Sequence, residues 1–144
     1  MMTRYKAVRI LLALGGLFAV LAAGAGPASA FGISSHAACD DQAVLRAIAY
    51  RFSINDRNVL KQGLAIDAYV EVQENRYQPA YEGSMIDRRF CQGRVAMNDG
   101  RTRTIWYMIE AGQGLAGFGG NVDYCIAGLD PWRIYGANCQ SVRQ

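Results

Sequence analysis

Four cysteines constrain this chain more than any other feature of its 144 residues. Cys39, Cys91, Cys125 and Cys139 are separated by 52, 34 and 14 positions, so they contain no C-x-x-C pair. A zinc site normally requires such pairs together with histidine ligands, but the chain has a single histidine, His36. We therefore expect two disulfide bonds, for which three pairings are possible.

Residues 1–30 indicate that the chain is exported. Three basic residues precede an apolar run at positions 10–23, and the small-residue exit Ala28-Ser29-Ala30 follows. This order is typical of a secretory signal peptide cleaved before Phe31. The alternative is a membrane anchor, but the apolar run is shorter than the ~20 residues that span a bilayer. We expect a single domain over residues 31–144, with no membrane span after cleavage, in the periplasm or outside the cell.

Removing the leader also removes the positive net charge. Residues 1–30 contain three of the 15 basic residues and none of the 12 acidic ones, which leaves 12 of each. Nucleic-acid-binding domains normally carry a clustered excess of Lys and Arg. We therefore expect no nucleic-acid partner.

Hydrophobic periodicity predicts helices at the start of the domain. After a capping Asp40, apolar residues recur at Val44, Ile48 and Phe52, the spacing of a helix with one buried stripe. Residues 55–63 predict a second, short helix that begins at an asparagine cap and ends at a glycine.

Alternation of apolar and polar residues predicts a sheet after these helices. In the first strand Ile66, Ala68, Val70 and Val72 are expected to share one face. The expected strands are residues 64–73, 85–97, 102–111, 121–127 and 132–135. The fold class is then α+β, with the helices packed on one face of an antiparallel meander of about four to five strands.

This topology favours one of the three disulfide pairings. Cys125 is expected to join Cys139 across the final hairpin. Cys39 is then expected to join Cys91, which would fasten the helix start to the middle of the sheet. Each bond typically contributes ~2–4 kcal/mol to stability.

The sequence Asn98-Asp99-Gly100-Arg101 predicts a hairpin with a two-residue Asp-Gly turn of type I′. In this register Arg89 faces Glu110 as an ion pair and Gly93 faces Trp106. One face then carries Cys91, Val95, Met97, Trp106 and Met108. The other, solvated face carries Arg88, Gln92, Arg94, Arg103 and Tyr107.

Residues 112–120, GQGLAGFGG, contain the G-x-G-x-x-G pattern of a dinucleotide-binding turn. That pattern requires a helix after its third glycine, but another strand is expected here and only 24 residues follow Gly120. We therefore expect no nucleotide cofactor, and glycines that serve a crowded connection between strands. Leu115 and Phe118 either cover the end of the core or form an apolar lip for a ligand or partner.

Metal and catalytic groupings are weak in this sequence. His36, Cys39, Asp40 and Asp41 lie close together, but a disulfide and a helix start explain them without a metal. His36 has no G-x-S-x-G nucleophile to act on. Four carboxylates offer paired-acid chemistry, and their spacing selects no pair: Asp67, Glu71, Glu74 and Glu82. We assign no catalytic, metal-binding or cofactor-binding residue.

The arginines of the hairpin offer the main candidate for a binding surface. Arginine binds carboxylates and phosphates through two parallel hydrogen bonds and stacks on aromatic rings. Together with the glycine loop, the candidate surface comprises Arg88, Arg94, Arg103, Tyr107, Leu115 and Phe118. The alternative is an ordinary polar sheet face.

The segments CDDQAVLRAIAYRF, LAID, RRFCQGR and GFGGNVDYCIAGLDPWRIYGANC resemble a family of small exported alphaproteobacterial proteins of unknown function. The resemblance covers most of residues 39–139, with all four cysteines. It implies export and a shared disulfide framework, and it supplies no catalytic residue.

We therefore expect an exported, non-enzymatic module that binds a protein or an anionic envelope component in the periplasm. Two alternatives remain open. One is a small cell-envelope hydrolase, and the other is a small-molecule carrier with a cavity between helix and sheet.

Overall fold

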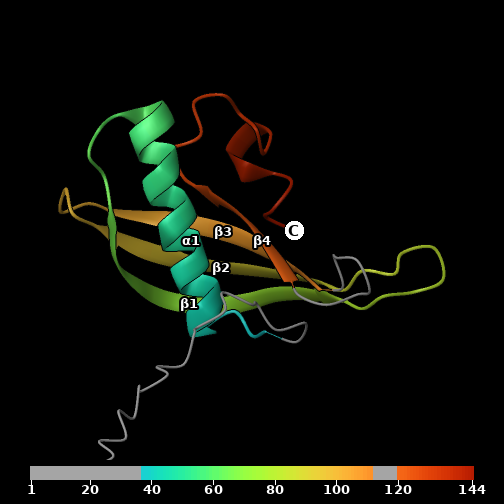
Figure 1. Cartoon of the computed structure of the whole chain (residues 1–144). Helices are drawn as coiled ribbons and strands as arrows, with labels where there is room; N and C mark the ends of the chain where they lie inside the picture. The colour runs from blue at the N-terminus through green and yellow to red at the C-terminus, as the bar shows by residue number, and fades with distance from the viewer. Residues whose placement is uncertain (1–36, 112–119) are drawn as a thin grey trace, which may run out of the picture.

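The computed structural model describes residues 37–111 and 120–144, in which a helix lies across one face of an antiparallel sheet (Figure 1). The helix α1 (Gln42–Asn55) continues into a π-helical turn, η1 (Asp56–Leu60). The sheet has the order β1-β2-β3-β4. Its strands and the following 3-10 turn are β1 (Ile66–Gln78), β2 (Arg88–Met97), β3 (Thr102–Ala111), β4 (Gly120–Ile126) and η2 (Ala137–Cys139).

The predicted α+β meander is confirmed, with four strands in the described residues. The first strand is longer than expected and extends to Gln78. The expected strand at residues 132–135 is wrong, because these residues form turns.

Helix α1 begins one residue later than the predicted cap. The carboxylate of Asp41 accepts a hydrogen bond from the backbone N–H of Ala43 at 2.7 Å, which satisfies a free donor of the first turn. The expected apolar stripe is buried against the sheet, with Val44, Ile48 and Phe52 each at most 1% exposed.

The short second helix is an extension of α1 and has no asparagine cap of its own. Asp56 ends this extension because its carboxylate accepts hydrogen bonds from the backbone N–H groups of Gln62 and Gly63, at 3.3 and 2.9 Å. Asp56 is buried, and these bonds compensate for its removal from water.

Strand β1 does not alternate as predicted. The residues that pack on the core are Ile66, Tyr69 and Val72, whereas Val70 is exposed. The physical reason is a set of register shifts along β1, since each inserted residue breaks the period of two. Gly93 of β2 allows this close packing, because a Cβ there would lie 3.2 Å from the Val72 side chain.

The register of the β2–β3 hairpin differs by one residue from the prediction. Met97 donates to the carbonyl of Arg101 at 3.0 Å, and Gly100 donates to the carbonyl of Met97 at 2.9 Å. The loop therefore has three residues, a type I turn followed by left-handed Gly100 with φ 76°. A type I′ turn would also need positive φ at Asp99, which does not have it.

This one-residue difference exchanges the two faces of β3. Gly93 pairs with Ile105 in place of Trp106, and Arg88 pairs with Glu110 in place of Arg89. Tyr107 consequently enters the core beside α1 and is fully buried. Our placement of Tyr107 on the solvated face is therefore wrong.

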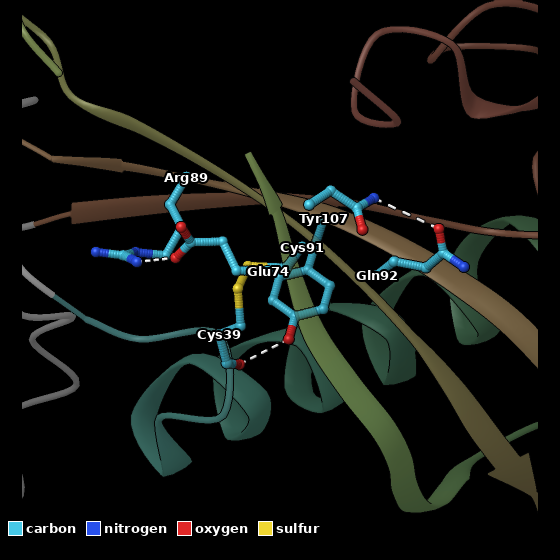
Figure 2. The surroundings of a disulfide bond; sticks show 7 residues. Cys39, Glu74, Arg89, Cys91, Gln92 and Tyr107 are labelled. Atoms are coloured by element: carbon cyan, nitrogen blue, oxygen red, sulfur yellow. Dashed lines mark hydrogen bonds and ion pairs between the residues drawn. A yellow bond between two sulfur atoms is a disulfide. The ribbon is translucent and has the colours of Figure 1, made fainter. Parts of the chain in front are cut away.

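Both expected disulfides are present, Cys39–Cys91 and Cys125–Cys139. The first joins the chain just before α1 to the middle of β2. Figure 2 shows the Tyr107 hydroxyl beside this bond, where it donates a hydrogen bond to the Cys39 carbonyl at 2.6 Å.

The chain after β4 forms a second, smaller apolar cluster. The Cys125–Cys139 disulfide holds it, and buried Val142 packs there with Trp106 and Met108 of β3. Since Trp106 and Met108 alternate with the core residues of β3, this cluster lies on the sheet face away from α1. No helix within residues 37–111 and 120–144 is long and apolar enough to cross a bilayer.

Candidate functional site

The structure does not bring the predicted binding residues together on one exposed surface. Tyr107 is buried in the core. Arg94 pairs across the strands with Thr104 and Arg103 with Val95, so these two arginines start from opposite faces of the hairpin. Leu115 and Phe118 belong to residues 112–119, which lie outside the described residues, as does the rest of the G-x-G-x-x-G pattern.

The hairpin arginines of the predicted binding surface each lie beside a carboxylate. Arg88 binds Glu110 at 2.8 Å, Arg103 binds Asp99 at 2.7 Å, and Arg94 lies 3.6 Å from Glu71. The Arg103 guanidinium and the Arg101 backbone N–H lower the pKa of Asp99 to about 2. Among the described hairpin residues, exposed Arg101 is the arginine left without an ion pair.

Two of the four carboxylates considered for catalysis are held in ion pairs with arginines. Glu71 pairs with Arg94, and Glu74 pairs with Arg89 next to the Tyr77 ring. In the part of the chain that the structure describes, no three metal-ligating side chains gather. His36 lies outside that part, and Cys39 is oxidised.

A groove of about 240 Å³ lies at the C-terminal end of α1. Its walls come from α1, η1, β4 and the chain that follows β4, which approach one another at this end of the sheet (Figure 1). The lining residues are mostly apolar and aromatic, namely Phe52, Asn55, Val59, Tyr124, Cys125, Ile126, Leu129, Asp130, Pro131, Trp132, Ile134 and Tyr135.

The rim of this groove exposes large apolar side chains. Trp132 and Ile134 are each 73% exposed, and Val59 of η1 is 44% exposed. Buried Phe52 also lines the groove. The groove thus joins the protein core to an apolar surface patch.

Asp130 fixes the turn that carries Trp132 and Ile134. Its carboxylate accepts hydrogen bonds from the backbone N–H groups of Ile134 and Tyr135, at 3.0 and 3.1 Å. Its own carbonyl accepts a hydrogen bond from Arg133, which has a positive φ of 51°. The exposed side chains therefore stand on a hydrogen-bonded turn, next to the Cys125–Cys139 disulfide.

The outer edge of β4 is closed beside the groove. Arg51 of α1 donates hydrogen bonds to the carbonyl of Val122 and, at 2.9 Å, to the side-chain oxygen of Asn121. An incoming strand would have to displace Arg51 to pair with β4.

The groove contains few groups that change charge near neutral pH. Burial, together with the neighbouring Tyr135, raises the pKa of Tyr124 well above its usual range. Burial and the carboxylate of Asp123 likewise raise the pKa of Tyr135. Both phenols are therefore neutral in ordinary buffers. Among the described lining residues the carboxylate belongs to Asp130. Its two oxygens accept hydrogen bonds from the backbone N–H groups of Ile134 and Tyr135.

Sequence reasoning missed the rim residues because Trp132 and Ile134 alternate with Arg133 and Tyr135, which imitates a strand. The useful signal was the Asp-Pro sequence at 130–131 between Gly128 and Gly136. Aspartate followed by proline initiates turns through its side chain, and so few residues between two glycines leave little room for a paired strand.

Comparisons with known proteins add no further information about the site. No protein-family model, curated protein sequence or solved structure matches the chain.

Proposed function

We propose that this protein is an exported, non-enzymatic module that binds a protein or another component of the cell envelope through the groove at the end of α1. One observation carries the proposal: Trp132 and Ile134 are 73% exposed at the rim of an apolar groove, on a turn fixed by Asp130. Contiguous exposed apolar patches mark interaction sites, and tryptophan is among the residues that dominate binding energies.

Export is supported by two separate features. The N-terminal segment has the order of a signal peptide. All four cysteines form disulfides, which are typical of proteins in an oxidising compartment.

The size of the groove favours a partner's side chains over an enclosed small molecule. Pockets for small molecules usually measure about 300–1,000 Å³ and surround their ligand. This groove, at about 240 Å³ with a highly exposed rim, is smaller. The carrier alternative therefore has less support.

The hydrolase alternative also has less support. Paired-carboxylate hydrolysis needs one acid that donates a proton and one carboxylate that attacks or activates water. Asp130 accepts two backbone hydrogen bonds in the turn, and the nearby tyrosines hold their protons. The groove is better suited to contact than to proton transfer.

The test compares wild type with the double variant Trp132→Ser/Ile134→Ser, using protein isolated from the producing cells. Each is mixed with the washed envelope fraction of those cells and sedimented. We expect wild type to sediment with the envelope and the double variant to lose about tenfold or more in affinity, the loss of one strong anchor.

The matched control is Tyr81→Ser/Met85→Ser, which removes an aromatic and an aliphatic side chain that are 58% and 85% exposed between β1 and β2. This control should bind like wild type. The proposal would be refuted if wild type did not sediment with the envelope fraction, or if both double variants lost the same amount of affinity for it.

A further inference from the structure

The arginines and the lysine near the groove differ from those of the hairpin. Arg57 and Lys61 flank Val59, and Arg133 stands between Trp132 and Ile134. All three are exposed, and none makes an ion pair with any residue that the structure describes. Each hairpin arginine of the predicted binding surface lies beside a carboxylate.

Two carboxylates at this end of the molecule accept hydrogen bonds from the backbone. Asp56 is buried and accepts hydrogen bonds from Gln62 and Gly63. Asp130 accepts those of Ile134 and Tyr135. Three exposed cations therefore lie within two residues of the exposed apolar side chains, and we call Val59, Trp132, Ile134, Arg57, Lys61 and Arg133 the groove-end surface.

We propose that the groove-end surface docks on an anionic lipid bilayer, with Trp132 and Ile134 entering the headgroup region. This inference rests on the proposed function and names its envelope component. Tryptophan favours the membrane interface because its ring is apolar and its N–H is polar. Lysine and arginine close to an anionic surface are attracted to it, about fivefold in partition for each residue.

The arrangement fits a lipid surface better than other occupants. Trp132 and Ile134 project from the protein, as insertion into a bilayer requires. The polar side chains of the described groove walls are Asn55, Asp130 and the two tyrosines, Tyr124 and Tyr135. A protein strand cannot extend the sheet here without displacing Arg51 from the Val122 carbonyl of β4.

The test uses sedimentation with vesicles of phosphatidylcholine alone or with one-third phosphatidylglycerol. We expect wild type to bind the anionic vesicles, to bind the neutral ones weakly, and to be released by salt. Trp132→Ser/Ile134→Ser and, separately, Arg57→Gln/Lys61→Gln/Arg133→Gln should each lose about tenfold or more in partition.

The charge control is Arg46→Gln/Arg76→Gln/Arg101→Gln, which removes the same number of exposed charges elsewhere. It should bind nearly as well as wild type. If both triple variants lose vesicle partition equally, the inference is overturned, because the attraction to anionic vesicles would then depend on the total charge of the protein alone.

The vesicle and envelope experiments fail in different ways. If wild type does not bind anionic vesicles but still binds the envelope fraction through Trp132 and Ile134, the lipid inference is wrong. The proposed function then stands with a protein partner. If wild type binds neither, both are wrong.

Discussion

The hydroxyl of Tyr107 connects the middle of the sheet to the chain that precedes α1. It lies in the core and donates to the carbonyl of Cys39, a residue that is also held by its disulfide to Cys91. Burial and the nearby Asp40 carboxylate raise the pKa of this phenol well above its usual range. The group is therefore a hydrogen-bond donor at any pH at which the protein is normally handled.

Tyr107→Phe should destabilise the protein by about 1–3 kcal/mol, because it leaves the buried Cys39 carbonyl without its donor. Denaturant unfolding measures this loss. Tyr81→Phe is the control, since Tyr81 is exposed, and it should change little. A Tyr107→Phe protein as stable as wild type would show that the hydrogen bond contributes nothing.

Asp123 of β4 should make stability depend on pH. Burial and the carboxylate of Glu110 raise its pKa, and Arg51 opposes the rise. A carboxyl group with a higher pKa in the folded state binds more protons when folded. Its contribution to stability is therefore full below the unfolded pKa of about 4, and it is lost as the pH rises through the folded value.

Asp123→Asn removes this titration. As the pH rises from mildly acid to neutral, the unfolding free energy of the variant should therefore increase relative to that of wild type. Urea unfolding of both proteins at both pH values measures this change. If the unfolding free energies of the two proteins differ by the same amount at both pH values, the raised pKa of Asp123 is contradicted.

Among the elements, the β2–β3 hairpin shows what a sequence pattern can determine. The alternation of apolar and polar residues predicted both strands and the position of their connection, because this alternation is a local property of the sequence. The register depended on the dihedral angles of Asp99 and Gly100, which an Asp-Gly pair leaves open between two turn types. The positions of Tyr107 and Trp106 followed from that choice, and so did the face of Arg103.

Gly100 should be the residue on which this turn depends most. Its φ is 76°, and nothing lies within 4 Å of the space that a Cβ would occupy. Gly100→Ala should therefore cost about 1–2 kcal/mol from backbone strain alone, measured by denaturant unfolding. Gly100→Asn should cost less, because asparagine tolerates the left-handed conformation. Equal losses for both variants would indicate a cause other than φ.

The turn at residues 130–135 shows what a sequence pattern cannot determine. Its shape depends on hydrogen bonds from Ile134 and Tyr135 to the Asp130 side chain, which no hydrophobic period records. The groove could not be predicted for the same reason, since it forms only where this turn meets the end of α1. The disulfide Cys125–Cys139 was predicted because it required only that the chain turn back after β4.

In the molecule as a whole, stability and exposed apolar surface lie in separate places. The main core lies between α1 and the sheet, a second cluster lies around Cys125–Cys139, and one disulfide ties each in place. The patch formed by Val59, Trp132 and Ile134 lies outside both clusters. Such a patch costs solubility and adds little to the fold, so we infer that it serves binding.

One comparison decides whether Trp132 and Ile134 serve binding or folding: the unfolding free energy of Trp132→Ser/Ile134→Ser, measured on the same samples as envelope sedimentation. We predict an unfolding free energy within about 0.5 kcal/mol of wild type, together with lost sedimentation. A loss of stability above about 2 kcal/mol, as for a buried side chain, with envelope binding intact, would contradict this function.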